Sequence, residues 1–233
     1  MSVTGTLSRS DAKKAIRKGR VSVNGTLPVA ADMEVDAAND RITLDAKEIV
    51  YRRFTYIMLN KPEGYVSATN DKRDKTVLEL LPDNLRRLNL FPCGRLDKYT
   101  LGLMLLTDDG ELSHRLLAPR SHVDKSYRFD SARGVSEDER GALENGVYIE
   151  GGYLTKPAKV KLDSEGASSG IITLREGKYH QIKQMFEATS NKITYLERVT
   201  FGPLVLDASL ERGEWRFLTK EEEDALFASV DKQ

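Results

Sequence analysis

A short apolar run between two glycines constrains this chain more than any other feature. Leu103 to Leu106 form the run, Gly94 precedes it and Gly110 follows it. Four apolar residues suit a buried strand and are too few for a helix, and the Thr-Asp-Asp-Gly that follows predicts a turn and a helix start. Arg95 and Asp97 lie just before the run. The pattern therefore predicts a carboxylate in an irregular loop tied to a rigid strand, where catalytic groups are often held.

The same stretch has a plainer interpretation and a more specific one. Spacing alone favours a local ion pair between Arg95 and Asp97, with glycines that only shape a bend. However, Gly-Arg-Leu-Asp-x-x-Thr-x-Gly-Leu-x-Leu-Leu-Thr-x-Asp-Gly, from residue 94 to residue 110, resembles the signature of the RsuA family of RNA pseudouridine synthases. The resemblance implies that Asp97 is the catalytic residue. Because so many positions of the motif match, we weigh it above the ion pair.

Composition places few restrictions on the class of protein. The 233 residues suffice for one large domain and a small one, and 36 basic side chains balance 36 acidic ones. No apolar run approaches the roughly 18 residues that span a bilayer, so we expect no membrane association. The single cysteine, Cys93, rules out an internal disulfide and is typical of the cytoplasm. One cysteine and three scattered histidines also argue against a zinc site.

Charge is segregated along the chain, although its total is zero. Residues 1–25 carry six basic side chains and one acidic side chain, whereas residues 211–233 carry seven acids and four bases. Ser8 followed by Asp11 predicts a helix start, and Gly19 predicts its end near residue 18. Asn24-Gly25 predicts a hairpin turn after a short strand. The basic residues predicted to contact RNA phosphates here are Arg9, Lys13, Arg17 and Arg20.

Residues 8–25 are similar to the S4 RNA-binding module. The match departs from that module at its start, because residues 1–7 are too short and too polar to supply the further upstream helix. We therefore expect an S4-like module with its first helix missing or truncated, at residues 1–48. A solvated basic helix face is the alternative that charge alone leaves open. Residues 45–53 are expected to connect the module to a catalytic domain at residues 53–233.

Three further segments resemble motifs of the same synthase family. Leu-Asn-Lys-Pro-x-Gly ends a predicted strand, and the resemblance implies that Lys61 supports the catalytic turn through the backbone and contacts RNA. Lys-Ser-Tyr implies that Tyr127 lies against the target base, although a half-buried strand aromatic is the commoner fate of such a residue. Gly-Lys-x-His-Gln-x-Lys implies that Lys183 pairs with the catalytic aspartate. His180 is either a structural histidine or an RNA contact.

The resemblance implies an α+β fold in which a mixed, mostly antiparallel sheet forms the pseudouridine synthase domain. It implies that the enzyme isomerises one uridine of small-subunit (16S) ribosomal RNA, with Arg95 on a phosphate or in the space that the flipped base vacates. Large-subunit (23S) RNA is the alternative substrate. No cofactor or metal is required for this isomerisation. The expected partner is ribosomal RNA or a ribosomal precursor particle, and the expected form is a cytoplasmic monomer.

Two other classes of function stay open on sequence grounds. The chain could bind RNA without turning it over, as an assembly factor. Alternatively Asp97, Asp108 and Asp109 could ligate a metal in a phosphoryl-transfer enzyme. For a synthase, the route of Asp97 also has three options: attack on C1′ of the ribose, attack on C6 of the base, or removal of a ribose proton.

Overall fold

A nine-stranded sheet runs through most of the molecule in the computed structural model, which describes residues 6–28, 30–36, 39–49, 51–118 and 123–231. The strand order is β10-β11-β7-β12-β6-β4-β14, with β13 on β12 and β5 on β6. Every one of these pairings is antiparallel except β12 with β6. The expected mixed, mostly antiparallel sheet is thus confirmed. Its strands are β4 (Tyr56–Lys61), β5 (Phe91–Pro92), β6 (Leu101–Thr107), β7 (Lys125–Ser131), β10 (Lys159–Leu162), β11 (Ser169–Leu174), β12 (Ile193–Phe201), β13 (Leu204–Val205) and β14 (Trp215–Phe217).

The predicted buried strand is the middle of β6. The strand is buried along its length after Leu101, because β4 and β12 flank it and side chains cover both faces. Gly102 is what allows β12 to approach as a parallel neighbour. Its φ is +96°, and a Cβ at this position would lie 2.3 Å from the carbonyl oxygen of Arg198. The helix expected after β6 is α3 (Gly110–Leu117), which Asp109 caps by accepting a hydrogen bond from the Leu112 amide.

Helices and short segments cover the sheet and divide the core into three clusters. One cluster joins β7, β11 and β12 to α4 (Glu137–Asn145) and α5 (Gln181–Ala188), where the rings of Phe129 and Phe186 lie 4.9 Å apart. A second joins α3 and α6 (Lys220–Asp231) to β4 and β6. The third lies under η1 (Val77–Leu80) and α2 (Asp83–Arg86). A two-stranded hairpin of β8 (Tyr148–Ile149) and β9 (Tyr153–Leu154), with η2 (Glu150–Gly152) between them, borders α5.

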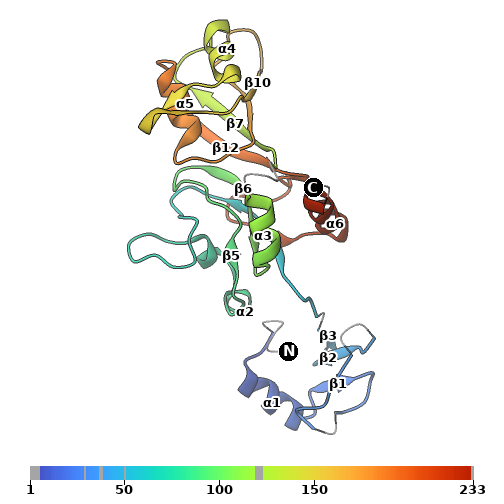
Figure 1. Cartoon of the computed structure of the whole chain (residues 1–233). Helices are drawn as coiled ribbons and strands as arrows, with labels where there is room; N and C mark the ends of the chain where they lie inside the picture. The colour runs from blue at the N-terminus through green and yellow to red at the C-terminus, as the bar shows by residue number, and fades with distance from the viewer. Residues whose placement is uncertain (1–5, 29, 37–38, 50, 119–122, 232–233) are drawn as a thin grey trace.

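The N-terminal segment forms a separate small sheet beside one helix (Figure 1). The helix α1 (Arg9–Arg17) has Ser8 as its N-cap, buries Ala12 and Ala15, and is followed by Gly19 at φ +66°, as the sequence predicts. Asn24 and Gly25 have φ values of 51° and 81°, so the tight turn is confirmed. The sheet consists of β1 (Val21–Val23), β2 (Ile42–Leu44) and β3 (Lys47–Glu48).

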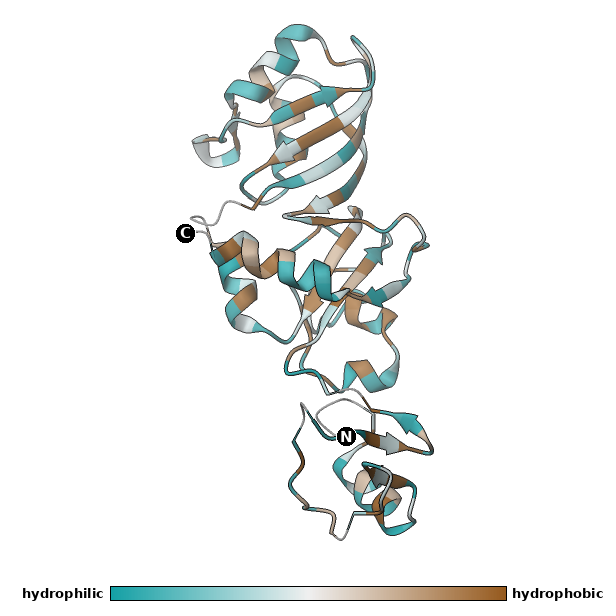
Figure 2. Cartoon of the chain, turned by 90° about the vertical axis from the view of Figure 1, so that its right-hand side faces the viewer, coloured by the Kyte–Doolittle hydropathy of each residue, from teal (hydrophilic) through white to brown (hydrophobic). Residues whose placement is uncertain are grey.

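The expected connecting segment begins later than predicted. Residues 45–48 are not a linker, because Asp45 and Ala46 form the turn of a β2–β3 hairpin with φ values of 50° and 64°. Figure 2 shows apolar residues along the strands of the large sheet and polar residues on the outer faces of the helices. Among the described residues, no helix combines the length and the apolar character needed to cross a membrane.

Candidate active site

A tight turn directly before β6 presents the side chain of Asp97. The turn closes where the Thr100 amide donates to the carbonyl of Asp97 at 3.0 Å. Upstream, Ser67 Oγ accepts a hydrogen bond from the Leu96 amide at 2.9 Å and donates to the Leu96 carbonyl at 2.8 Å. Gly94 takes a φ of +83°, as expected of the glycine that opens the bend. The backbone on both sides of Asp97 is therefore fixed, which defines the point from which its side chain projects.

Lys61 holds the same turn from the interior of the protein. Its side chain is fully buried, with 0% exposure, and its Nζ lies 2.8–3.2 Å from the carbonyl oxygens of Pro62, Asp97, Lys98 and Thr100. Burial lowers the pKa of Lys61 to about 8, and the charge of Asp97 acts in the opposite direction. The expected backbone contact is thus present. The expected contact with RNA is wrong, since no part of the side chain reaches the surface; β4 also continues through this residue, and the break comes at Pro62.

Two side chains from the start of α5 converge on the carboxylate. Lys183 Nζ donates to Asp97 Oδ2 at 3.0 Å, and His180 Nε2 lies 3.5 Å from Oδ1. The side chains of Asp97, His180 and Lys183 are 27%, 37% and 29% exposed, so the group is shielded and still open to a ligand. A carboxylate with one cation and one imidazole at this exposure can act as a nucleophile or as a base.

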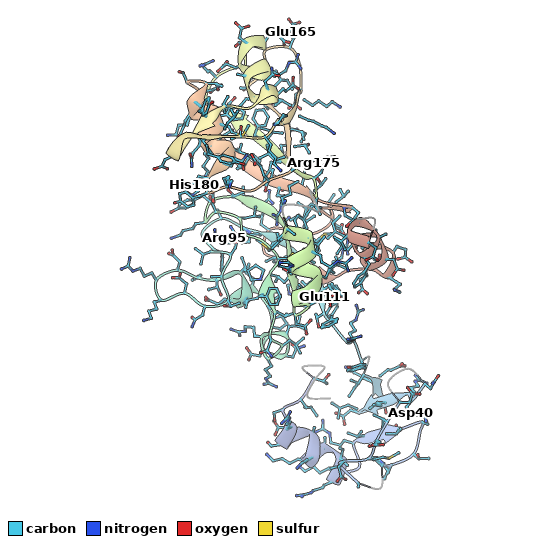
Figure 3. The ribbon with its side chains drawn as sticks, viewed as in Figure 1. Asp40, Arg95, Glu111, Glu165, Arg175 and His180 are labelled. Carbon is cyan, nitrogen blue, oxygen red and sulfur yellow. The ribbon has the colours of Figure 1, made fainter. Side chains whose placement is uncertain are left out.

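The start of α5 has an unusual backbone at this point. His180 is the N-cap residue and takes a left-handed conformation, with φ 49° and ψ 28°. The buried side chain of Gln181 secures the turn by accepting a hydrogen bond from the Lys178 amide at 2.9 Å and by donating to Glu176. This conformation lets His180 and Lys183 face the same carboxylate. Figure 3 labels His180 and Arg95 on one side of the molecule.

Tyr127 and Arg95 differ in their burial: the first packs against the core and the second is exposed. Tyr127 is half-buried on β7 and packs against two of the core clusters, which also contain Leu96 and Ile182, the neighbours of the acid site. Arg95 is exposed. The carboxylate of Asp97 instead pairs with Lys183, which overturns the local Arg95–Asp97 ion pair that spacing alone favours. Arg95 is therefore available to a ligand.

The basic residues predicted on and after α1 are all exposed. Arg9, Lys13 and Arg17 lie on the helix itself. Arg20 follows it and forms a two-point pair with Asp45 on the β2–β3 turn. The helix therefore presents its cations to solvent, while Arg20 also joins the helix end to the small sheet.

The three carboxylates considered as metal ligands do not converge. Asp108 accepts a hydrogen bond from the Thr55 amide, and Asp109 is buried where it caps α3 and accepts from the Tyr56 hydroxyl at 2.6 Å. Across the described ranges, no group of three or more His, Cys, Asp or Glu side chains is arranged to hold a metal ion. Asp108 and Asp109 thus stabilise the fold through hydrogen bonds, whereas Asp97 belongs to the acid site.

Sequence reasoning missed Ser67 and gave Gln181 no role. Ser67 lies in a segment without a recognisable motif, and its importance follows only from its two bonds to Leu96. Gln181 belongs to the His-Gln-x-Lys segment, so the motif already contained a signal for it. Its burial of 96% within a helix start indicates a structural task.

Comparisons with known proteins agree with this geometry. Residues 55–188 match the family described as RNA pseudouridylate synthase. An uncharacterized RNA pseudouridine synthase of Bacillus subtilis (strain 168) is 44% identical over 92% of this chain and 91% of its own length. Ribosomal small subunit pseudouridine synthase A of Escherichia coli (strain K12) is 38% identical over 93% of each chain.

A solved structure gives the same result for the fold. The structure titled "Crystal structure of pseudouridylate synthase" superposes with a TM-score of 0.70 at 37% identity, covering 96% of this chain and 95% of that one. The family match includes the turn of Asp97 and the start of α5, which supply the acid and its cation. The chain therefore belongs to the RNA pseudouridine synthase family and is an RNA pseudouridine synthase.

Proposed function

We propose that the enzyme converts one uridine of small-subunit (16S) ribosomal RNA to pseudouridine, with Asp97 as the catalytic residue. The observation that carries the proposal is the 3.0 Å pair between Asp97 and Lys183, which the fold assembles from positions 86 residues apart. The choice of RNA is supported by relatives named ribosomal small subunit pseudouridine synthase A, at 36–38% identity over most of the chain.

The reaction is an isomerisation. The N1–C1′ bond of uridine breaks, the base turns, C5 bonds to C1′, the proton on C5 leaves and N1 takes up a proton. No group is lost and no electron is gained, so the chemistry calls for a carboxylate beside the sugar and for groups that place it. Asp97 provides the carboxylate. The ammonium of Lys183 fixes its direction and offsets the cost of holding this charge in a partly buried site.

The uridine must leave the base stack to reach this carboxylate. We assign the contact with the flipped base to the half-buried Tyr127, because stacking on an aromatic face supplies ~1–3 kcal/mol per base. Arg95, exposed one residue before Leu96, binds a phosphate or occupies the space that the base leaves. His180 contacts Asp97 and borders the bound nucleotide.

Residues 1–48 act, in this proposal, as an S4-like module that adds affinity without base selection. The exposed cations of α1 support this role, since phosphate contacts depend on charge rather than on sequence. Residues 53–233 form the catalytic domain. We further propose that the enzyme works as a cytoplasmic monomer on ribosomal RNA or on a precursor particle, without a cofactor or a metal.

Mapping pseudouridines in ribosomal RNA from cells that lack the protein tests the substrate. Carbodiimide mapping or mass spectrometry is expected to show one missing pseudouridine in 16S RNA, restored by the wild-type gene. A missing site in 23S RNA instead would overturn the assignment of the subunit. Unchanged modification at every site of both RNAs would overturn the assignment to ribosomal RNA.

The same cells separate catalysis from RNA binding alone. Asp97→Asn is expected to restore no product, because the amide can act neither as a nucleophile nor as a base, while RNA affinity stays within about threefold of wild type. The amide keeps the shape of the side chain, so the fold should persist. If Asp97→Asn restored the missing pseudouridine, Asp97 would not be the catalytic group.

A further inference from the structure

An exposed aromatic ring lies next to the acid site and has no task in the mechanism above. Tyr179 is 69% exposed, and one face of its ring covers His180, with ring centroids 3.9 Å apart and an angle of 18° between the planes. His180 in turn lies 3.5 Å from Oδ1 of Asp97. The carboxylate, the imidazole and the phenol thus follow one another outward, and the outer ring remains open to solvent.

The position of this ring is fixed by contacts of its neighbours. Gln184 Nε2 donates to the Tyr179 carbonyl at 2.7 Å, while Gln184 Oε1 accepts from the Glu150 amide at 2.9 Å. The left-handed backbone of His180 directs the imidazole toward Asp97. Non-glycine residues keep such strained conformations where the surrounding structure enforces them, and they are frequent at ligand sites. The backbone that carries the ring is therefore held in place, and the stack on His180 orients the ring itself.

A rigid exposed ring beside a carboxylate that acts on an extruded nucleotide is suited to base stacking. Single-stranded RNA is recognised largely by unstacked bases on aromatic side chains, and every base offers a face for this contact. The imidazole of His180 contacts both the ring of Tyr179 and the carboxylate of Asp97, so Tyr179 lies one side chain away from the acid that acts on the target. The base that fits is therefore a neighbour of the target.

We propose that Tyr179 is a substrate-binding residue whose open ring face stacks on the base of a nucleotide flanking the flipped uridine. This proposal rests on the proposed function, in which Asp97 acts on a single extruded uridine. It assigns to Tyr179 a part in holding the RNA beside the target, through a stack that any base can form.

The first experiment measures kcat and KM on ribosomal RNA from cells that lack the enzyme. Tyr179→Ala is expected to raise KM about 5- to 150-fold, the range that the loss of one base stack implies, while kcat stays within about threefold. Tyr179→Phe and Tyr179→Trp keep a ring and should retain the wild-type KM. Tyr148→Ala is the matched control, because Tyr148 is also 69% exposed and lies on β8 beside α5.

The second experiment pairs the protein change with an RNA change. Short RNAs that carry the mapped uridine receive an abasic nucleotide at one flanking position at a time, and binding is measured with the Asp97→Asn protein to prevent turnover. At one position the abasic RNA should bind more weakly, by the factor seen for Tyr179→Ala. The protein with both Asp97→Asn and Tyr179→Ala should lose nothing further on that RNA.

Three results would overturn the proposal. In the first, the KM of Tyr179→Ala equals that of Tyr148→Ala. In the second, Tyr179→Ala lowers kcat instead of raising KM. In the third, each abasic RNA loses the same affinity for the protein with Tyr179 and for the protein with Tyr179→Ala. The second result would mean that the ring only positions His180. Failure of the proposed function would be seen separately, because Asp97→Asn would then still form pseudouridine. A target in 23S RNA changes the RNA used and leaves this test intact.

Discussion

At Asp97, the backbone and the side chain have different partners. Lys61 and Ser67 hold the backbone on either side of the residue, whereas Lys183 and His180 contact the carboxylate. Because these two sets come from different segments, the direction of the carboxylate can be changed without loosening the turn. Substitutions at Lys183 and at Lys61 should therefore have different effects.

Replacing the cation beside the acid should impair chemistry more than binding. Lys183→Met is expected to lower kcat about 100-fold with little change in KM, because a carboxylate without its ammonium loses its fixed direction. Lys183→Arg keeps a cation and should recover part of the rate. Single-turnover assays on unmodified ribosomal RNA measure both variants. A wild-type kcat for Lys183→Met would remove the pair from the mechanism.

Lys61 should make stability depend on pH in the alkaline range. Its pKa is about 8 in the folded protein, below the ordinary value of 10.5, so the unfolded chain binds more protons between these values. Stability therefore rises with pH across this window, by about 3 kcal/mol from this group. Urea unfolding at pH 8 and pH 10 should show about 2 kcal/mol of this rise. In Lys61→Met the free energy of unfolding should rise less over the same pH range. An equal rise in the variant and the wild type would contradict the prediction.

The acid and its cation could be predicted from sequence, but the burial of Lys61 could not. Asp97 and Lys183 stand in long motifs, and the structure brings them together at 3.0 Å. The motif implies that Lys61 supports the turn, but lysine is rarely buried, so the residue type alone predicts an exposed side chain. Four carbonyl oxygens converge on Lys61 from two segments, and only the folded chain brings them together.

Among the elements, β6 depends most strongly on a single residue. Gly102→Ala is expected to destabilise the protein by about 3 kcal/mol, because the new Cβ meets the Arg198 carbonyl at 2.3 Å and the backbone has a positive φ. Urea denaturation measures the loss. Gly110→Ala is the control, since no atom lies within 4 Å of its Cβ and the residue begins α3. That variant should be as stable as wild type or slightly more so.

Helices and strands could be predicted where the local sequence and the pattern of buried residues indicate the same element. β6 and α3 follow from a short apolar run and from a cap, and both are present. The β2–β3 hairpin was missed because Asp45 and Ala46 form its turn, and alanine is not a residue that signals a left-handed backbone. The parallel pairing of β12 with β6 could not be predicted from the sequence either, since it depends on contacts between distant segments.

On the scale of the whole molecule, an excess of positive charge is concentrated in residues 1–25, on and after α1. Replacing Lys13 and Arg17 with glutamine should reduce the slope of log affinity against log salt by about 1.5, because each phosphate contact contributes about 0.7–0.9. Filter binding to ribosomal RNA at several salt concentrations measures the slope. Arg140 and Lys220 form the control pair, since both already pair with acids on α4 and α6. Equal slopes for the two variants would exclude α1 from the RNA contact.

The central parallel pairing has a consequence for synthesis on the ribosome. β6 is made early, but its neighbour β12 and the helix that carries Lys183 follow many residues later, and β14, the partner of β4, comes later still. Such distant pairings close slowly, after the intervening chain has emerged. A nascent chain that stalls before α5 therefore carries the acid without its counter-ion. A copy released before Lys183 is made therefore lacks the cation that pairs with Asp97, and we expect it to be inactive on RNA.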